Sequence, residues 1–375
     1  MSTTDVIIIG GGLAGLTSAI HLTKAGLKVI VIEKSRYPSH KVCGEYISNE
    51  VLPYLQWLNI DPAPLQPASI SRLLLSDHQG KTLTAQLPLG GFGISRYAFD
   101  HFLMERFLAQ GGELINDTVT DVRMENDRMY VQTRERGVFV APLAVGAYGK
   151  RASLDVKLSR GFVQQRSPWL AVKAHYKGDF PADTVSLHNF RGGYCGVSTV
   201  EGGIINICYL VHYDSFKKYQ DIETHQQEAV YGNPFLKEVL TNSTLIFEKR
   251  LAISQISFAR KEKVFDHILM AGDTAGLIHP LCGNGMAMAI HSGQIVSRNI
   301  LDYFFTYKKD RRRLETTYIH DWEKAFSRRL RMGRVLSACF QHEQLAVSMM
   351  KGLTCFPRLL PKIIKMTHGK PLTCG

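Results

Sequence analysis

The hydrophobic positions near the start of the chain form a strand–helix–strand pattern. Residues 6–9 are four consecutive β-branched residues, which is typical of a parallel strand covered on both faces. Apolar positions from Leu13 to Ala25 then recur at helical spacing, and Gly26 follows where a helix commonly ends. A second apolar run covers residues 28–32 and leads into Glu33. The pattern therefore predicts the first β–α–β unit of a parallel sheet.

Three glycines occupy the turn between the first strand and the helix. Gly10 allows a tight turn, Gly12 lets the backbone approach a pyrophosphate, and Gly15 lets the helix pack closely on the strand. The free N–H groups at the start of the helix suit phosphate oxygens. Glu33, about 20 residues further on, is placed to accept a hydrogen bond from a ribose hydroxyl. This segment predicts a dinucleotide site, and by itself it leaves both FAD and NAD open.

The middle of the chain predicts a second unit that is rich in strands. Residues 95–100 precede an amphipathic helix that starts near residue 101 and closes at Gly111 and Gly112. Strand patterns follow at residues 118–125, 129–133 and 138–145. Residues 169–210 then alternate short strand patterns with glycine turns, which predicts an antiparallel sheet inserted into the nucleotide-binding domain. A sheet of this kind commonly supplies the substrate-facing wall of a cofactor cavity.

A downstream segment, residues 267–293, favours FAD over a nicotinamide. An apolar strand ends near Ala271 and runs into Gly272 and Asp273, and residues 283–285 (Gly-Asn-Gly) open a helix of small residues. Asp273 is placed to accept a hydrogen bond from a ribityl hydroxyl, and the positive end of the helix would face an electron-rich ring. Reduced isoalloxazine carries negative charge that N–H groups stabilise, whereas a nicotinamide enzyme needs no such arrangement.

Several ordered motifs together give the chain a family resemblance. The glycine loop with Glu33, the run KVCGEYIS at residues 41–48, the region of Arg96 and the Gly272–Asp273 block resemble the FAD-dependent geranylgeranyl reductase and FixC-like oxidoreductases. That family belongs with the class A flavin monooxygenases and flavin halogenases in one superfamily. The resemblance covers about residues 1–300. It implies a glutathione-reductase-like α/β fold: an FAD-binding Rossmann domain, an inserted antiparallel β-sheet substrate domain and a helical C-terminal region.

The expected domains are discontinuous along the chain. Residues 1–75, 95–165 and 255–300 would form the FAD-binding domain. Residues 76–94 and 166–254 would form the β-sheet substrate domain, and residues 301–375 a basic helical C-terminal region.

The resemblance also assigns residues to the two halves of FAD. The ADP half would be held by residues of the N-terminal unit, with an arginine on the pyrophosphate side: Gly10, Gly12, Gly15, Glu33 and Arg96. The flavin half would be held by the downstream segment, with the proline beside the reactive face of the ring and the last three residues at its pyrimidine edge: Gly272, Asp273, Pro280, Gly283, Asn284 and Gly285.

Three departures from the superfamily's motifs bear on the reaction. The monooxygenases carry a GADG-type segment after the third strand, and here residues 146–149 read Gly-Ala-Tyr-Gly, with Tyr148 in place of the acid. This weakens the case for a hydroxylase driven directly by NADPH. The WxWxIP segment of the halogenases is absent. The YxWxFP segment of the geranylgeranyl reductases is not matched cleanly by residues 194–198, which leaves specificity for a prenyl chain open.

Three side chains are candidates for the chemistry. Cys43 and Glu45 lie in the CGE segment, which approaches the flavin cavity in similar enzymes. Cys43 could give a proton to a substrate carbon after hydride transfer, and Glu45 could tune Cys43 or position the substrate. His279, beside Pro280, could serve as an acid or base. Each also has a structural interpretation, since a free cysteine often only packs and a loop histidine often only bonds to carbonyl groups.

Charge and cysteine content set limits on partners and compartment. The formal net charge is +12, and basic residues concentrate in residues 308–315, 328–334 and 357–366. These clusters could meet an anionic membrane surface or an acidic carrier protein, or they could be a solvated helix face. Nucleic acid is not expected because no binding module accompanies the charge. No apolar run is long enough to span a membrane. Seven scattered cysteines, with no metal-binding spacing, predict reduced thiols in a cytoplasmic protein.

The sequence therefore predicts an FAD-dependent oxidoreductase. It would pass electrons from NAD(P)H or a reductase partner through FAD to a hydrophobic substrate, reducing a C=C bond of an isoprenoid, polyene or related lipid. One alternative is a monooxygenase acting on a hydrophobic or carrier-bound aromatic or polyketide substrate, which uses the same scaffold and requires a dry pocket. Another is an electron-transfer flavoprotein without a substrate of its own.

Overall fold

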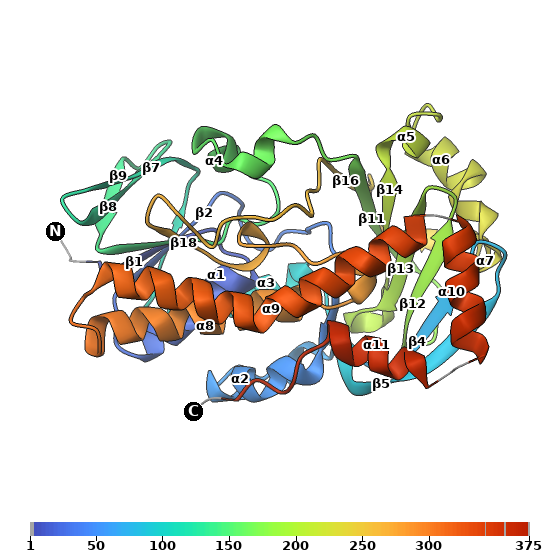
Figure 1. The fold of residues 1–375 in the computed structure, drawn as a ribbon, viewed down its shortest axis with the longest axis horizontal. Coiled ribbons are helices and arrows are strands. Elements are labelled where there is room, and N and C mark those ends of the chain that lie inside the picture. Colours follow the sequence, from blue (N-terminus) through green and yellow to red (C-terminus); the bar gives the residue numbers. More distant parts are fainter. Residues whose placement is uncertain (1–3, 342, 356–357, 374–375) are drawn as a thin grey trace.

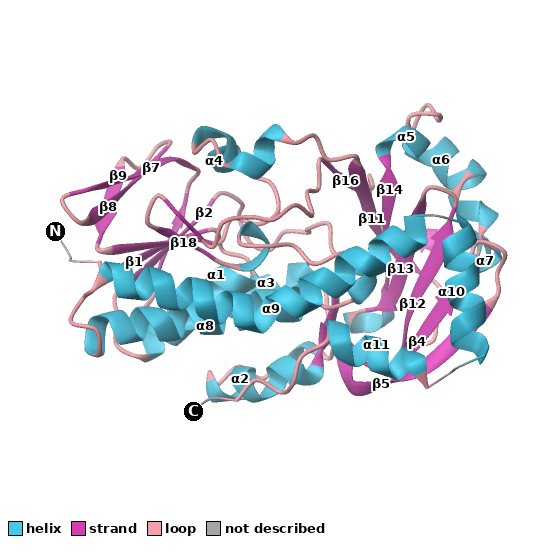
Figure 2. Cartoon of the chain, in the orientation of Figure 1, coloured by secondary structure: helices cyan, strands magenta, loops and turns pink. Residues whose placement is uncertain are grey.

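The structure, a computed structural model, describes residues 4–341, 343–355 and 358–373. Its strands gather in separate sheets toward opposite ends of the molecule, and the long helix α9 runs between the two ends (Figure 1). Figure 2 shows that loops make most of the connections across the middle of the molecule. This mixed α/β architecture confirms the predicted fold class.

A six-stranded sheet forms the core of the N-terminal lobe. Its order is β17–β18–β10–β1–β2–β6, and the pairs from β18 to β6 are parallel. The bounds of these strands, in chain order, are β1 (Val6–Ile9), β2 (Val29–Glu33), β6 (Glu113–Asn116), β10 (Leu143–Gly146), β17 (Val264–Phe265) and β18 (Ile268–Met270). Every residue of β1 is buried, as the continuous β-branched run predicts.

Three helices pack near this sheet, and their close contacts explain the small residues in their sequences. They are α1 (Leu13–Lys24), α3 (Arg96–Ala109) and α8 (Gly285–Phe305). A Cβ atom at Gly293 of α8 would lie only 3.0 Å from the carbonyl oxygen of Ala14, so α1 and α8 approach each other closely. Helix α3 starts five residues earlier than predicted, because the Ser95 hydroxyl accepts a hydrogen bond from the N–H of Ala98 and caps it.

The predicted strand at residues 138–145 is in fact two strands in two sheets. β9 (Val138–Ala141) pairs with β8 (Arg128–Thr133), which pairs with β7 (Val119–Glu125), and these three form a small antiparallel sheet. β10 begins at Leu143 and pairs with β1. Pro142 separates the two strands, and a proline cannot donate the hydrogen bond that a continuous strand would need.

A nine-stranded sheet forms the second lobe in the described part of the chain. Its order is β15–β11–β14–β13–β12–β4–β5–β3, and β16 also pairs with β11. The bounds are β3 (Tyr46–Ser48), β4 (Ala68–Ser76), β5 (Thr82–Gly93), β11 (Trp169–Lys177), β12 (Thr184–Phe190), β13 (Gly193–Thr199), β14 (Ile205–His212), β15 (Thr244–Leu245) and β16 (Leu251–Ser254).

This larger sheet differs from the expectation in two respects. Strands β3 and β4 belong to it, although the expected boundary assigned residues 1–75 to the FAD-binding domain and cut through β4. The pair β4–β12 is parallel, so the sheet is mixed and not wholly antiparallel. β3 joins the sheet by pairing with β5, and β4 lies between β5 and β12, whose paired residues are more than 100 positions away along the chain.

The two faces of the larger sheet have different partners. One face of β11 and β14 packs against residues of the short helices α6 (Ile222–Glu228) and α7 (Pro234–Thr241) and the segments that flank them. The residues that alternate with these, such as Ala171 and Leu210, turn toward the other lobe. Three further short helices are α2 (Leu52–Trp57), α4 (Ser153–Lys157) and α5 (Tyr213–Phe216).

The basic C-terminal region is helical, as predicted, and covers both lobes. Helix α9 (Arg311–Gln341) runs along α8, and α11 (Leu359–Thr367) lies against β5 (Figure 1). Leu353 of α10 (Glu343–Cys355) and Leu360 and Ile364 of α11 are buried with residues of β4 and β5. Much of the apolar face of this region therefore covers the protein's own core. Among the described residues, no helix is long and apolar enough to cross a membrane.

Candidate cofactor and substrate site

A cavity of about 560 Å³ lies between the two lobes. Its lining includes residues at the carboxyl ends of β1 and β2 and residues that directly follow β10 and lie near the end of β18. The larger sheet supplies the opposite wall. Open parallel sheets bind their ligands at the carboxyl ends of the strands, so the cavity lies where a dinucleotide is expected.

The glycine loop has the tight backbone geometry that the sequence predicted. Gly10 has φ +103°, and a Cβ atom there would lie 2.5 Å from the carbonyl oxygen of Ala147. A Cβ atom on Gly15 would collide with the carbonyl oxygen of Gly10. Gly12 precedes α1 as its N-cap and has no side chain to occupy the N–H groups of the first turn. The loop therefore leaves backbone donors at the cavity, where a pyrophosphate could accept from them.

Glu33 lines the cavity and also holds the loop. One carboxylate oxygen of Glu33 accepts a hydrogen bond of 2.7 Å from the N–H of Gly11, and the other accepts one of 2.9 Å from the N–H of Ser35. The sequence predicted contact with a ribose hydroxyl and not these two bonds. Each carboxylate oxygen has a further lone pair, so we propose that Glu33 both shapes the loop and faces the adenosine half of the cofactor.

Arg96 lies beside the glycine loop in a mostly buried charge cluster. Its guanidinium makes two hydrogen bonds of 2.7 Å to the carboxylate of Asp100, and Lys41 makes one of 2.9 Å to the same carboxylate. A Cβ atom on Gly12 would lie 3.2 Å from Nη2 of Arg96. Although burial opposes ionisation, the charges of Arg96 and Lys41 hold the pKa of Asp100 below its usual range. The two cations and one carboxylate leave a net positive charge, which would attract a diphosphate.

The downstream segment also lines the cavity. Asp273 lies in a helical turn at Gly272–Thr274 and lines the cavity, and Pro280 lines it from the turn Pro280–Cys282. Gly283 has φ +60°, and Asn284 is the N-cap of α8. Asn284, Gly285 and Met286 line the cavity at the N-terminus of this 21-residue helix.

The residues at the cavity fit a flavin dinucleotide. Two helix N-termini, those of α1 and α8, reach the cavity. The side-chain oxygen of buried Asn284 has no hydrogen-bond partner among the described residues, so an acceptor is left at this end of the cavity. FAD carries a diphosphate in its middle and an electron-rich ring at one end, which matches donors at both positions.

Glu45 is a fully buried carboxylate with three donors. It accepts hydrogen bonds of 2.8 Å from the N–H of Arg96, 2.5 Å from Nζ of Lys173 and 2.7 Å from Nε2 of His175. Burial alone would raise the pKa of Glu45, but the hydrogen bond from His175 and the charge of Lys173 hold it below its ordinary value. Glu45 is the member of this cluster that lines the cavity, and Lys173 and His175 support it from behind.

Cys43 also lines the cavity, and the sheet fixes the backbone on both sides of it. Asn206 donates a hydrogen bond of 3.3 Å to the carbonyl oxygen of Cys43, and Ser198 donates one of 3.1 Å to that of Gly44. Arg96 lines the same cavity. Within the described residues the cysteines are free thiols, and Cys374 lies outside those residues. The structure thus brings Cys43, Glu45 and Arg96 together.

The larger sheet adds an apolar arm to the cavity next to this polar cluster. Ala171 pairs with Leu210, and Leu210 pairs with Tyr194, in one row across β11, β14 and β13. Lys173 lies one step along the same face of β11. Further apolar side chains on this wall are Val185, Leu187, Ile253, Ile256 and Leu277. The sheet therefore presents a polar end to Cys43 and Glu45 and an apolar stretch beside it.

His279 does not join the other catalytic candidates. It is absent from the described lining of the cavity, and its ring lies among Trp169, Tyr194 and Phe258. Neither ring nitrogen has a hydrogen-bond partner among the described residues, and burial lowers the pKa of His279 to about 3. A neutral histidine packed in an aromatic cluster is a poor acid or base at neutral pH, so the structure favours the packing interpretation.

Sequence reasoning missed Lys173 and His175. Both lie on β11, in the run WLAVKAHYK, where alternate positions face opposite sides of the sheet. A lysine and a histidine at alternate positions, and so on one face, of a largely apolar strand were the available signal. The sequence alone could not show that their partner is Glu45, which is 128 residues from Lys173.

Comparisons with known proteins agree with this geometry. The profile of a family described as FAD binding domain matches residues 5–44. The chain is 24% identical to digeranylgeranylglycerophospholipid reductase 1 of Methanosphaera stadtmanae, across 87% of this chain and 81% of that protein. It is also 24% identical to protein FixC of Escherichia coli, across 98% of this chain and 94% of that protein.

Solved structures show the same fold at low sequence identity. The flavin-dependent brominase Bmp2 superposes with a TM-score of 0.82 at 18% identity, covering 100% of this chain and 95% of the brominase. A geranylgeranyl bacteriochlorophyll reductase-like protein from Thermoplasma acidophilum gives a TM-score of 0.75 at 19% identity, covering 98% of this chain and 92% of that protein.

The fold, the cavity and these similarities define the class first: the chain is an FAD-dependent oxidoreductase. Within that class it is similar to geranylgeranyl reductases and to FixC, and it shares its fold with flavin-dependent halogenases.

Proposed function

We propose that this oxidoreductase reduces a C=C bond in an isoprenoid, polyene or related lipid. The observation that carries the proposal is the apolar arm of the cavity, which ends beside Cys43 and Glu45. An isoprenoid chain is apolar along its whole length and fits a wall of alanine, leucine and valine side chains. Relatives that align across most of this chain are digeranylgeranylglycerophospholipid reductases, and their names describe reductases of such a lipid.

Reduction of a double bond adds a hydride to one carbon and a proton to the other. FAD, when bound and reduced, supplies the hydride. Cys43 supplies the proton: its S–H bond breaks, a C–H bond forms, and a thiolate is left near the guanidinium of Arg96, which stabilises the negative charge. Solvent then returns a proton to the thiolate. Glu45 and its donors keep the loop that carries Cys43 in place.

The electrons would come from NAD(P)H or from a reductase partner. Lys34, Lys150 and Arg151 line the cavity, and their charges suit a phosphate-bearing donor that binds only transiently. We propose the same type of attraction for the exposed basic side chains of α9, which would meet an anionic membrane surface or an acidic carrier that presents the substrate. Binding of the protein to anionic vesicles and to acyl carrier protein is measured at low salt. If it binds neither, the proposed role of the basic side chains of α9 is wrong.

The decisive test is anaerobic. Holoprotein with chemically reduced FAD is mixed with digeranylgeranylglycerophospholipid in detergent micelles, and reoxidation of FAD is followed by absorbance. We expect the unsaturated lipid to accelerate reoxidation and to gain two hydrogen atoms per double bond by mass spectrometry, whereas the fully saturated lipid has no effect. Equal rates with both lipids would count against reduction of this bond type.

Monooxygenation is the second candidate, because a water-poor apolar arm also suits oxygen chemistry. Tyr148, which lines the cavity where the monooxygenases carry an acid, is evidence against it. Admission of oxygen to the reduced protein separates the two reactions. A transient spectrum that precedes the oxidised one, with an oxygen atom gained by an added aromatic compound, would favour the monooxygenase. If the lipid does not accelerate reoxidation and no oxygenated product forms, the results favour an electron-transfer protein.

A further inference from the structure

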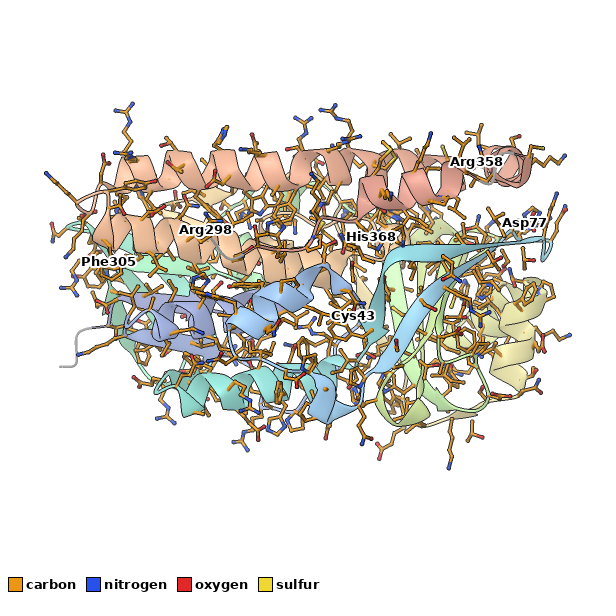
Figure 3. The ribbon with its side chains drawn as sticks, turned by 90° about the horizontal axis from the view of Figure 1, so that it is seen from below. Cys43, Asp77, Arg298, Phe305, Arg358 and His368 are labelled. Atoms are coloured by element: carbon orange, nitrogen blue, oxygen red, sulfur yellow. The ribbon has the colours of Figure 1, made fainter. Side chains whose placement is uncertain are left out.

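The last described residues of the chain pack directly behind the flavin end of the cavity. Residues 367–373, from the last residue of α11 onward, are here called the C-terminal strap. In Figure 3, His368 of the strap and Cys43 both lie in the central part of the molecule. Arg358, at the start of α11, lies near one end. The chain thus returns from the outer edge of the larger sheet to the region between the lobes.

Glu50 is the main acceptor for the strap. It is fully buried, and its carboxylate accepts hydrogen bonds from the N–H of Gly369 and from Nη1 of Arg329 on α9 at 2.9 Å. Its backbone carbonyl oxygen accepts a hydrogen bond of 2.8 Å from the N–H of Leu372, whose side chain is buried in the core of the N-terminal lobe. One residue therefore holds the strap at two points.

Asn284 connects this arrangement to the cavity. Its side-chain amide donates a hydrogen bond of 3.0 Å to the carbonyl oxygen of Thr367 in the strap and a longer one of 3.5 Å to Glu50. Asn284 is also the N-cap of α8 and lines the cavity. A second contact runs through Tyr46, which lines the cavity and lies edge-on to the ring of His368. The strap thus contacts two residues of the cavity wall from behind.

The packing at the strap leaves little room for adjustment. A Cβ atom on Gly369 would lie 2.6 Å from a carboxylate oxygen of Glu50 and would collide with the guanidinium of Arg329. A change in the position of the strap must therefore move Glu50, Asn284 or both. The strap contacts two residues that line the cavity. Docking of the strap and binding of a ligand at this end of the cavity can therefore share a coupling free energy.

We propose that the C-terminal strap is a positioning element of the cofactor site, with Glu50 as its hub, so that strap docking and FAD binding strengthen each other. Asn284 and Tyr46 touch the ligand, and Glu50, Arg329 and the strap act through them. The proposal rests on the position of FAD in this cavity and not on the reaction that the enzyme catalyses. The C-terminal region would then support the cofactor site from inside the protein, in addition to any binding by its outer surface.

Linkage makes two reciprocal predictions for the full-length protein. First, Glu50→Gln and Gly369→Ala weaken FAD binding by about tenfold, measured by titrating the apoprotein with FAD and following flavin fluorescence. Lys351→Ala, a change of an exposed residue of α10 outside the strap, leaves the dissociation constant within twofold of the wild type. Second, FAD slows trypsin cleavage after Lys362 and Lys365 of the wild type by more than fivefold, and Glu50→Gln reduces that protection.

An internal reference separates a local effect from general stabilisation. Arg136 is exposed in the turn between β8 and β9, in the other lobe, and its cleavage is followed in the same digests. Protection of Lys365 well beyond that of Arg136 is the expected result. Equal protection of both sites, or unchanged FAD affinity in folded Gly369→Ala, overturns the proposal. If Glu50→Gln does not fold, the wild-type digests and Gly369→Ala still decide.

A separate variant tests whether FAD binds in this cavity at all. Gly15→Val places a side chain against the carbonyl oxygen of Gly10, so it should abolish FAD binding whatever the strap does. If this variant is folded and binds FAD normally, FAD does not bind in this cavity and the strap proposal falls with that premise. If it loses FAD but the strap variants do not, only the strap proposal is wrong.

Discussion

The two ends of the cavity are built in different ways. At the adenosine end, Gly10, Gly15 and Glu33 lie within 24 residues of one another, and backbone contacts decide the shape. At the substrate end, Glu45 depends on Lys173 and His175, which are 128 and 130 residues away. The first end is fixed by backbone sterics, including a contact with Ala147, and the second by long-range charge pairing. The two ends should therefore fail differently when they are mutated.

The largest effect is expected at the adenosine end. In Gly15→Val, the new side chain meets the carbonyl oxygen of Gly10, so the helix must move away from the pyrophosphate position. We expect FAD affinity to fall at least about 100-fold, because a displacement of α1 removes several phosphate contacts together. The visible spectrum of the purified protein and FAD titration measure this. Gly232→Ala, at a glycine with open space around it, is the control and should remain yellow.

Removal of a cation at the substrate end should lower the free energy of unfolding strongly and should affect FAD affinity less. Lys173→Met leaves the buried Glu45 carboxylate without its closest cation. Breaking one side of a buried ion pair costs about 3–5 kcal/mol, so the free energy of unfolding in urea should fall by that amount. The double variant Glu45→Gln/Lys173→Met has no unpaired charge and should recover much of the loss. If the single variant is as stable as the wild type, the ion pair is not formed in solution.

Cys43→Ala should change turnover without changing the fold. Loss of a positioned proton donor lowers rates by roughly 10²–10⁴-fold, and we expect the lower part of that range because solvent can replace the thiol in part. Alkene reduction is compared with reduction of ferricyanide, which takes electrons without needing this proton. Cys355→Ala, at an exposed cysteine on α10, is the matched control. Equal losses with both acceptors would argue for a structural role of Cys43.

The smallest expected effect is a pH dependence of stability from Glu45. The pKa of Glu45 is lower in the folded protein than its ordinary value of 4.5. The carboxylate therefore stabilises the fold above pH 4.5, and this contribution is lost as the pH falls toward the folded pKa. Urea unfolding of the wild type and of Glu45→Gln should show a constant difference between pH 6 and 8 that shrinks below about pH 4.5. A difference that grows in acid would mean that burial outweighs the two cations.

Several parts of the site could be predicted because their signals are local in sequence. Gly10 and Gly15 fall where backbone atoms leave no space for a side chain, and the glycine spacing records that requirement directly. The start of α8 at Gly285 was likewise visible from the glycines before a run of small residues. The glycine spacing is local in sequence, although the backbone that closes on Gly10 is that of Ala147, after β10.

Other parts were not accessible to the same reasoning. His279 was expected near the chemistry because it precedes Pro280, but the side chain turns into an aromatic cluster formed by β11, β13 and residue 258. The same limit applies to β4, which joins the larger sheet through a partner more than 100 residues away. Neighbours in sequence say little about which way a loop side chain points or which strand closes an open edge.

The sequence by itself thus determined the glycine loop and the first β–α–β unit, because these follow from short-range sterics and hydrophobic periodicity. It indicated the class of fold and FAD through the downstream segment and through the resemblance of its ordered motifs to a known family. Tertiary structure alone decided the partners of Glu45, the location of His279 and the return of the C-terminal strap to Glu50. These contacts join segments that are far apart along the chain, and they form only because burial of the two lobes and of α11 brings those segments together.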